Sequence, residues 1–113
     1  MKVIDIHSHV FPYTSEKQAE SLGPSWPWLR LDSKEKGMIM SHGKEFRPVH
    51  YALWDPIKRI EDLDAVQIDT QIVCATPILF GYKCAEEEAV KAARLFNDLT
   101  MEFCQHSPNR LKA

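Results

Sequence analysis

The chain has 113 residues, of which 44% are hydrophobic and 27% are charged, a composition typical of a folded domain and not of a disordered segment. Fourteen basic and sixteen acidic residues leave a net charge of −2, so we expect neither a nucleic-acid surface nor a membrane-binding surface. The three cysteines lack Cys-x-x-Cys spacing, and no apolar stretch has the length of a signal peptide core or a membrane span, so we expect a protein of the reducing cytoplasm.

The first predicted element is a buried strand over Lys2–Val10 that ends in His7-Ser8-His9. Because side chains alternate along a strand, His7 and His9 are expected on one face, about 6.6 Å apart along the backbone. Two imidazoles at that spacing can bind one divalent metal ion, although a His-x-His triplet can also be just a polar strand end. The same alternation places Asp5 beside them, where its carboxylate would support the histidines. The apolar strand before the triplet favours the metal site.

The next stretch, from Phe11 to about Leu53, is rich in prolines, aromatics and short alternating runs, which predict a small β excursion. Three short antiparallel strands are expected in it, at Trp28–Leu31, Met38–Ser41 and Lys44–Val49. Asp32–Gly37 would form the first turn and His42-Gly43 the second, as a tight hairpin.

The last half of the chain alternates between helices and strands. Asp55-Pro56 predicts a helix start, with Ile57, Ile60 and Leu63 on its apolar face and Lys58, Arg59, Glu61 and Asp62 opposite. A short apolar strand at Thr70–Thr76, a helix from Cys84-Ala85 to Ser107, and the start of a strand at Arg110–Ala113 follow. This order predicts an α/β fold with right-handed βαβ units and a parallel sheet.

Several other chemistry-bearing residues have an ordinary structural interpretation. His42 is expected in the hairpin turn, His50 on an edge strand, and His106 at a helix end, while Cys74 is expected to be a small buried hydrophobe. The tryptophans are expected in the core or at interfaces: Trp26, Trp28 and Trp54. Arg47 could bind a carboxylate through its planar guanidinium, or it could be a surface arginine paired with a nearby acid.

The opening stretch Ile4–Pro12, with its His-x-His, resembles the first strand of the amidohydrolase superfamily. Within that superfamily, the chain is most similar to the metal-dependent decarboxylases of the kynurenine and 2-nitrobenzoate pathways, which act on a small dicarboxylic semialdehyde. Three further stretches carry this resemblance, in order along the chain: Gly43–Val49, Ala52–Pro56 and Cys74–Tyr82. The resemblance implies part of a distorted (β/α)8 barrel, with the first strand at 1–10, an antiparallel β insertion at 11–53, and two helices, the second strand and the start of the third at 54–113.

The resemblance also implies roles for individual residues. His7 and His9 would be two ligands of a zinc ion, or of another divalent transition metal, which activates water. Arg47 would bind a substrate carboxylate, with weaker contributions from Lys44 and Phe80. The remaining metal ligands and the acid/base histidine would come from later strands, and a further arginine from a second subunit, so no catalytic acid/base lies in this chain and the complete enzyme would be a homodimer.

A full barrel takes about 250 residues, so the chain is expected to correspond to an N-terminal fragment that is inactive alone and prone to self-association. Two alternatives to the decarboxylase remain open. One is another enzyme of the superfamily: a hydrolase, a hydratase or an aromatic-acid decarboxylase. The other is a non-catalytic chain, either an inert partial barrel or a module that self-associates through its open sheet edge.

Overall fold

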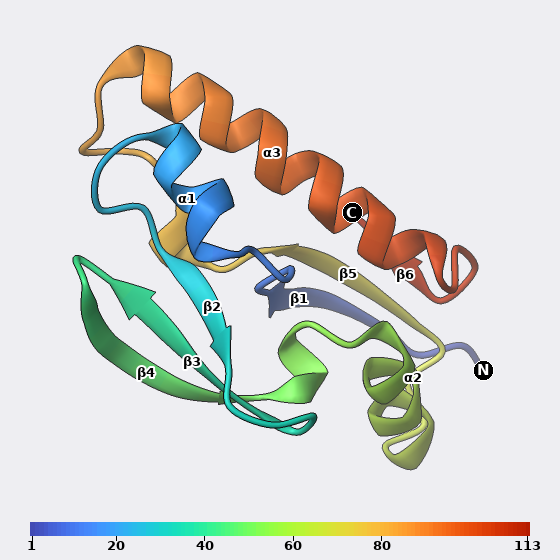
Figure 1. Cartoon of the computed structure of the whole chain (residues 1–113). Coiled ribbons are helices and arrows are strands. Elements are labelled where there is room, and N and C mark those ends of the chain that lie inside the picture. Colours follow the sequence, from blue (N-terminus) through green and yellow to red (C-terminus); the bar gives the residue numbers. More distant parts are fainter.

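The computed structural model describes residues 1–113 as an α/β fold built around two three-stranded sheets (Figure 1). The elements in chain order are β1 (Ile4–Val10), α1 (Glu16–Leu22), β2 (Trp28–Leu31), β3 (Lys36–Ser41), β4 (Lys44–His50), the 3-10 turn η1 (Tyr51–Leu53), α2 (Pro56–Ala65), β5 (Thr70–Ala75), the 3-10 turn η2 (Pro77–Leu79), α3 (Glu86–Gln105) and β6 (Leu111–Lys112). None of the helices combines the length and the apolar character needed to span a membrane.

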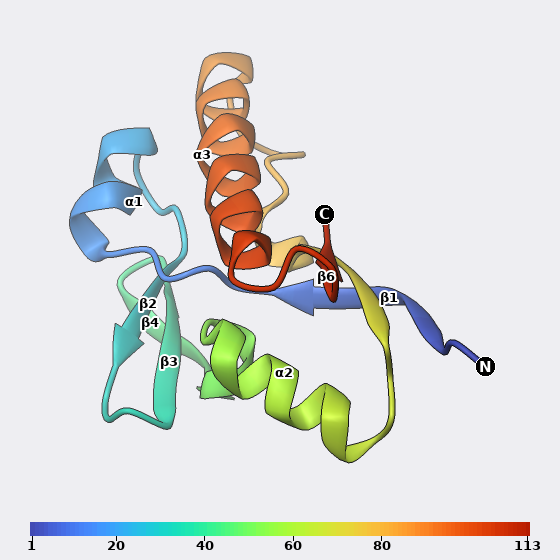
Figure 2. The same ribbon diagram turned by 90° about the vertical axis from the view of Figure 1, so that its right-hand side faces the viewer.

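The first sheet is parallel, in the order β1-β5-β6, as the alternation of strands and helices predicts. Along the chain, α2 directly precedes β5, and α3 lies between β5 and β6. Figure 2 shows the two helices beside this sheet. Both helices contribute to one buried cluster with the strands, composed of Val10, Leu63, Val73, Phe103, Cys104 and Leu111. The two helices therefore cover the same face of the parallel sheet.

The opposite face of this sheet is open to solvent. Ile6 is 79% exposed, Ile4 is 55% exposed, and Ile72 of β5 is also exposed. Cys74 lies on this face as well, so the expectation that it is buried is wrong. The helices cover only the face that carries Val73, and Cys74 is next to Val73 in a strand whose side chains alternate.

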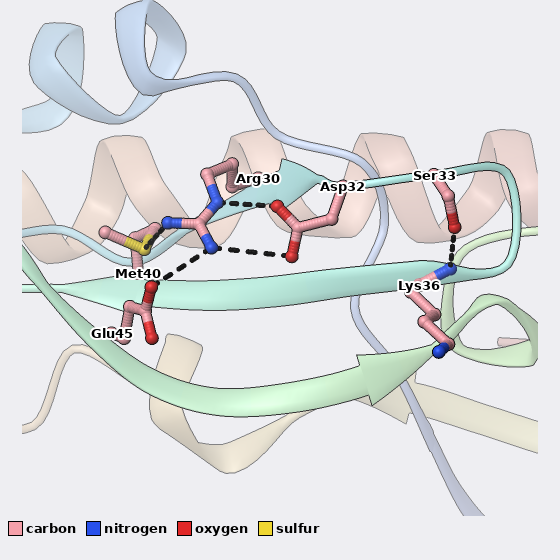
Figure 3. Close-up of polar contacts among 6 residues, drawn as sticks. All are labelled: Arg30, Asp32, Ser33, Lys36, Met40 and Glu45. Carbon is pink, nitrogen blue, oxygen red and sulfur yellow. Dashed lines mark hydrogen bonds and ion pairs between the residues drawn. The ribbon is translucent and has the colours of Figure 1, made fainter.

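The second sheet is an antiparallel meander, β2-β3-β4. His42 and Gly43 form the two-residue β3–β4 turn with φ values of 55° and 70°, the positive values that a type I′ hairpin requires. On the outer face, the Arg30 guanidinium donates to Asp32 at 2.7 Å and to Glu45 of β4 at 3.1 Å (Figure 3). These bonds raise the pKa of Arg30 and lower that of Asp32. Because the ion pairs are exposed, they add little to the stability of the sheet.

The stretch between β1 and β2 contains a helix, α1, where the sequence interpretation expected only β structure. Ser15 accepts a hydrogen bond from the Gln18 N–H, and the Gln18 side chain accepts one from the Ser15 N–H, which makes a complete capping box. Ala19 and Leu22 are buried in a second core cluster, which also contains Phe96 of α3. α1 therefore packs the β2–β4 unit against α3, and the Ser-x-x-Gln spacing was the sequence signal for it.

Candidate metal centre

His7 and His9 lie near the carboxyl end of β1, and their rings come together as the sequence predicts. The ring centroids are 4.9 Å apart with the planes nearly perpendicular, at 87°. A zinc ion about 2.0–2.1 Å from one nitrogen of each ring needs those nitrogens within about 4 Å of each other, which this separation allows. His7 is exposed and His9 is half-buried, so the pair is accessible from solvent.

Asp5 does not share this face, so the expectation that it lies beside the two histidine side chains is wrong. A β-bulge between Asp5 and Ser8 adds one residue to β1, so that Asp5 pairs with Gln71 whereas His9 pairs with Cys74. Positions 71 and 74 are an odd number of residues apart and point to opposite faces of β5. The bulge therefore turns the histidines to the open face and leaves Asp5 on the side of α2.

The Asp5 carboxylate contacts the backbone of the triplet instead of its rings. It accepts a hydrogen bond from the Gln71 side-chain amide at 2.7 Å and one from the His7 N–H at 3.1 Å. These two bonds, that from Gln71 first, hold the pKa of Asp5 below its ordinary value of 3.8. Asp5 is therefore a negatively charged acceptor at neutral pH.

Arg59 of α2 continues this hydrogen-bonded chain. Its guanidinium donates to the Gln71 side-chain oxygen at 3.3 Å, to the His9 carbonyl at 2.9 Å and to the Ala52 carbonyl at 2.9 Å. It also lies 5.9 Å from the centre of the Phe103 ring. Burial lowers the pKa of Arg59, and the nearby carboxylates of α2 and β1 partly offset that effect.

Arg59 is a residue that the sequence interpretation missed, because it was placed on the polar face of its helix. The register of α2 gives the signal: Arg59 is four residues before the buried Leu63 and so shares its face. Ile57, expected to face the core, is 63% exposed instead.

Cys74 contacts the candidate ligand His9 from the neighbouring strand. Its Sγ lies 3.2 Å from His9 Nδ1 and 3.5 Å from the Ser8 carbonyl oxygen. The open face thus places a thiol beside one of the two imidazoles, a contact that follows from the β1–β5 register and not from any sequence motif.

The donor set of this centre is partial. No group of three or more His, Cys, Asp or Glu side chains is arranged to hold a metal ion. A catalytic zinc site takes three protein ligands and leaves one position open. Two imidazoles on one strand fit a part of such a site, and that further ligands come from later strands stays a prediction.

The candidate substrate residues lie elsewhere. Arg47 is exposed on the edge strand β4, forms none of the ion pairs in the chain, and stacks its guanidinium 5.4 Å from the centre of the Phe46 ring. Lys44 is exposed at the start of β4. Phe80 is exposed after η2, 5.7 Å from the Tyr82 ring, and lines a cavity of about 330 Å³. No hydrogen bond or shared cavity among those described joins Arg47 to the histidines.

The remaining structural assignments agree with the structure. His42 lies in the hairpin turn, His50 ends the edge strand β4, and His106 caps α3. The three tryptophans take part in the core cluster of Phe11 and Phe96, with Trp26 fully within it and Trp28 and Trp54 packed against it.

The two histidines lie near the carboxyl end of the first strand of a parallel βαβ sheet, the edge at which sites of such folds lie. No protein-family profile matches the chain. Its curated relatives include two proteins named 2-amino-3-carboxymuconate-6-semialdehyde decarboxylase. That of Dictyostelium discoideum is 31% identical over 109 residues, and that of Caenorhabditis elegans is 33% identical over 111 residues.

These matches cover 95% and 96% of this chain but only 30% and 27% of the relatives. The chain thus spans less than a third of the length of the proteins it matches. The resemblance to a decarboxylase that the sequence motifs predict is confirmed over nearly the whole chain.

Proposed function

We propose that this chain is the metal-binding N-terminal portion of a zinc-dependent 2-amino-3-carboxymuconate 6-semialdehyde decarboxylase. The observation that carries the proposal is the pairing of His7 and His9 on the open face of β1, in a chain similar throughout to two decarboxylases of that name. In this proposal β1, β5 and β6 are the first three strands of a (β/α)8 barrel, with α2 and α3 on its outside. The segment 11–53 is the insertion that follows the first strand.

The proposed division of work follows the chemistry of each side chain. His7 and His9 supply two neutral nitrogen ligands, and bound zinc would supply Lewis acidity that lowers the pKa of a water towards neutrality. Arg47 binds a carboxylate of the substrate through two parallel N–H donors, which its freedom from ion pairs permits. Lys44 adds positive charge near it, and Phe80 provides an apolar wall.

The reaction would release carbon dioxide without an oxidant or an organic cofactor, as a step in tryptophan or 2-nitrobenzoate degradation. The acid/base group would belong to the remainder of the enzyme, and we propose that this chain alone is inactive. A homodimer is proposed for the complete enzyme.

The test uses the gene product that contains this chain and the remaining length of the relatives. Decarboxylation is measured as the loss of semialdehyde absorbance, and Arg47→Ala is expected to abolish most of it. The zinc content, measured by mass spectrometry, is expected to stay unchanged. Arg47→Lys is expected to restore little, because an ammonium group cannot bind a carboxylate in two-pronged geometry. Lys36→Ala, which removes an exposed positive charge from the neighbouring strand β3, is the control. Normal turnover by Arg47→Ala would contradict the substrate role.

The same assay separates the alternatives. If the protein hydrolyses, hydrates or decarboxylates a different substrate in a panel, another enzyme of the amidohydrolase superfamily replaces the proposal. The exposed isoleucines of the open sheet face favour a second candidate, a module that self-associates: Ile4, Ile6 and Ile72. Self-association without any decarboxylation in the longer protein would favour this candidate.

A further inference from the structure

Arg59 bonds to three separate parts of the fold at once. Its three donors reach the last part of β1 through the His9 carbonyl, η1 through the Ala52 carbonyl, and β5 through the Gln71 amide. The planar guanidinium has the fork of donors that three acceptors in different directions require, which a lysine lacks.

The Gln71 side chain extends this network to the other histidine. Its oxygen accepts from Arg59 and its nitrogen donates to Asp5, so a flipped amide would lose both bonds. Asp5 in turn accepts the His7 N–H. The network therefore begins at the carbonyl of one candidate ligand and ends at the amide of the other.

The β-bulge explains why this part of the strand needs such a network. The extra residue between Asp5 and Ser8 breaks the regular pairing of β1 with β5 at the point where His7 turns outward. The His7 N–H donates to the Asp5 carboxylate at 3.1 Å. Without that acceptor the bulge would be free to take other backbone conformations.

Arg59 is half-buried, and no carboxylate forms an ion pair with it. It is absent from the ion pairs of the chain, and its acceptors are two backbone carbonyls and a neutral amide. Taking a guanidinium from water without a carboxylate partner carries a desolvation cost.

We propose that Arg59 is a positioning residue of the metal centre, which holds the backbone of His7 and His9 so that both imidazoles are oriented before the metal binds. Gln71 and Asp5 transmit this constraint to His7. The inference rests on the proposed function in one respect, since it takes the two histidines as metal ligands. It adds a residue on α2, outside the His-x-His triplet, to the machinery of the site.

The test compares Arg59→Met with Arg110→Met in the 113-residue chain. Arg110 is a matched control, because its guanidinium also donates to two backbone carbonyls, those of Asp69 and Ile68, and it bonds to Asp64. It does so at the opposite end of β5, away from the histidines. The first readout is amide hydrogen exchange by NMR, and the second is the affinity for Zn²⁺ in a calorimetric titration.

In Arg59→Met, the His7 amide and the Phe11 amide, which donates to the Leu53 carbonyl, are expected to exchange about tenfold faster. The Zn²⁺ affinity is expected to fall about tenfold, as for other residues that orient metal ligands. Arg110→Met is expected to leave both quantities unchanged. Arg59→Lys is expected to match Arg59→Met, because an ammonium group lacks the planar set of N–H donors that binds three acceptors.

A second variant keeps the test independent of folding defects. Asp5→Ala changes only a half-exposed side chain and is expected to speed exchange at the His7 amide but not at Phe11. Equal exchange at His7 in Arg59→Met, Asp5→Ala and the parent chain would overturn the positioning role. Zinc binding that persists in His7→Ala and His9→Ala would instead contradict the proposed function, and the exchange data would still decide the role of Arg59.

Discussion

Replacing Gly43 by alanine isolates the conformational strain of the β3–β4 hairpin, which presents Lys44 and Arg47. Gly43 has φ of +70°, and a Cβ built on it meets no atom within 4 Å. The substitution therefore creates no clash, and its whole cost lies in forcing an L-residue into the left-handed region.

The magnitude follows from two opposing terms. The left-handed conformation costs an L-residue about 1–2 kcal/mol, whereas alanine restricts the unfolded chain and regains about 0.4–1 kcal/mol. The net loss is about 1 kcal/mol, which lowers the melting temperature of a domain of this size by about 4 °C. Asparagine tolerates positive φ better, so Gly43→Asn is expected to lose less than half as much.

The assay is thermal unfolding followed by circular dichroism, with His42→Gly as a control. This control relieves the positive φ of 55° at the neighbouring position and is expected to leave the melting temperature unchanged or higher. A melting temperature of Gly43→Ala equal to or above that of the parent chain would refute the turn geometry.

Three further predictions concern the parallel sheet. Because the pKa of Asp5 is lowered in the folded state, its carboxylate stabilises the fold fully above the unfolded pKa of 3.8, and this stability is lost as the pH falls through the lower folded pKa. Asp5→Asn should therefore reduce the loss of stability at acid pH, measured by urea unfolding at a series of pH values. An unchanged pH dependence would contradict the hydrogen-bond network of Asp5. Zinc should slow alkylation of Cys74, whose thiol lies 3.2 Å from His9, but not of Cys84, which is also exposed. The measurement is peptide mass spectrometry, and equal protection of both cysteines would point to a different site. Ile6→Lys should reduce self-association in light scattering, because this side chain is 79% exposed on the open face, and unchanged scattering would exclude that face as the contact.

Much of the fold could be predicted because local signals and tertiary structure agree. The Asp55-Pro56 helix start, the His42-Gly43 turn and the apolar strand at Thr70–Ala75 each depend on residues close in sequence, and the structure contains all three. The α1 helix was missed although Ser15 and Gln18 have capping-box spacing, because the surrounding prolines and aromatics suggested β structure.

The candidate site was less predictable, since it depends on contacts between distant segments. Strand alternation correctly predicts that His7 and His9 share a face. No sequence pattern in β1 predicts the bulge that places Asp5 on the other face. The contact of Cys74 with His9 arises from strand register. Arg59 joins the site only because α2 packs under β1, and helical spacing from Leu63 indicates its face but not its partners.

The most direct measurement of the central claim is the ¹⁵N NMR spectrum of the histidine rings during a zinc titration. The chain has five histidines, so His42, His50 and His106 serve as internal controls on the hairpin, the edge strand and the end of α3. We predict that one ring nitrogen of His7 and one of His9 shift together and saturate at about one zinc per chain, while the other three histidines stay unchanged. Shifts confined to the control histidines, or no shift at His7 and His9 at millimolar zinc, would contradict it.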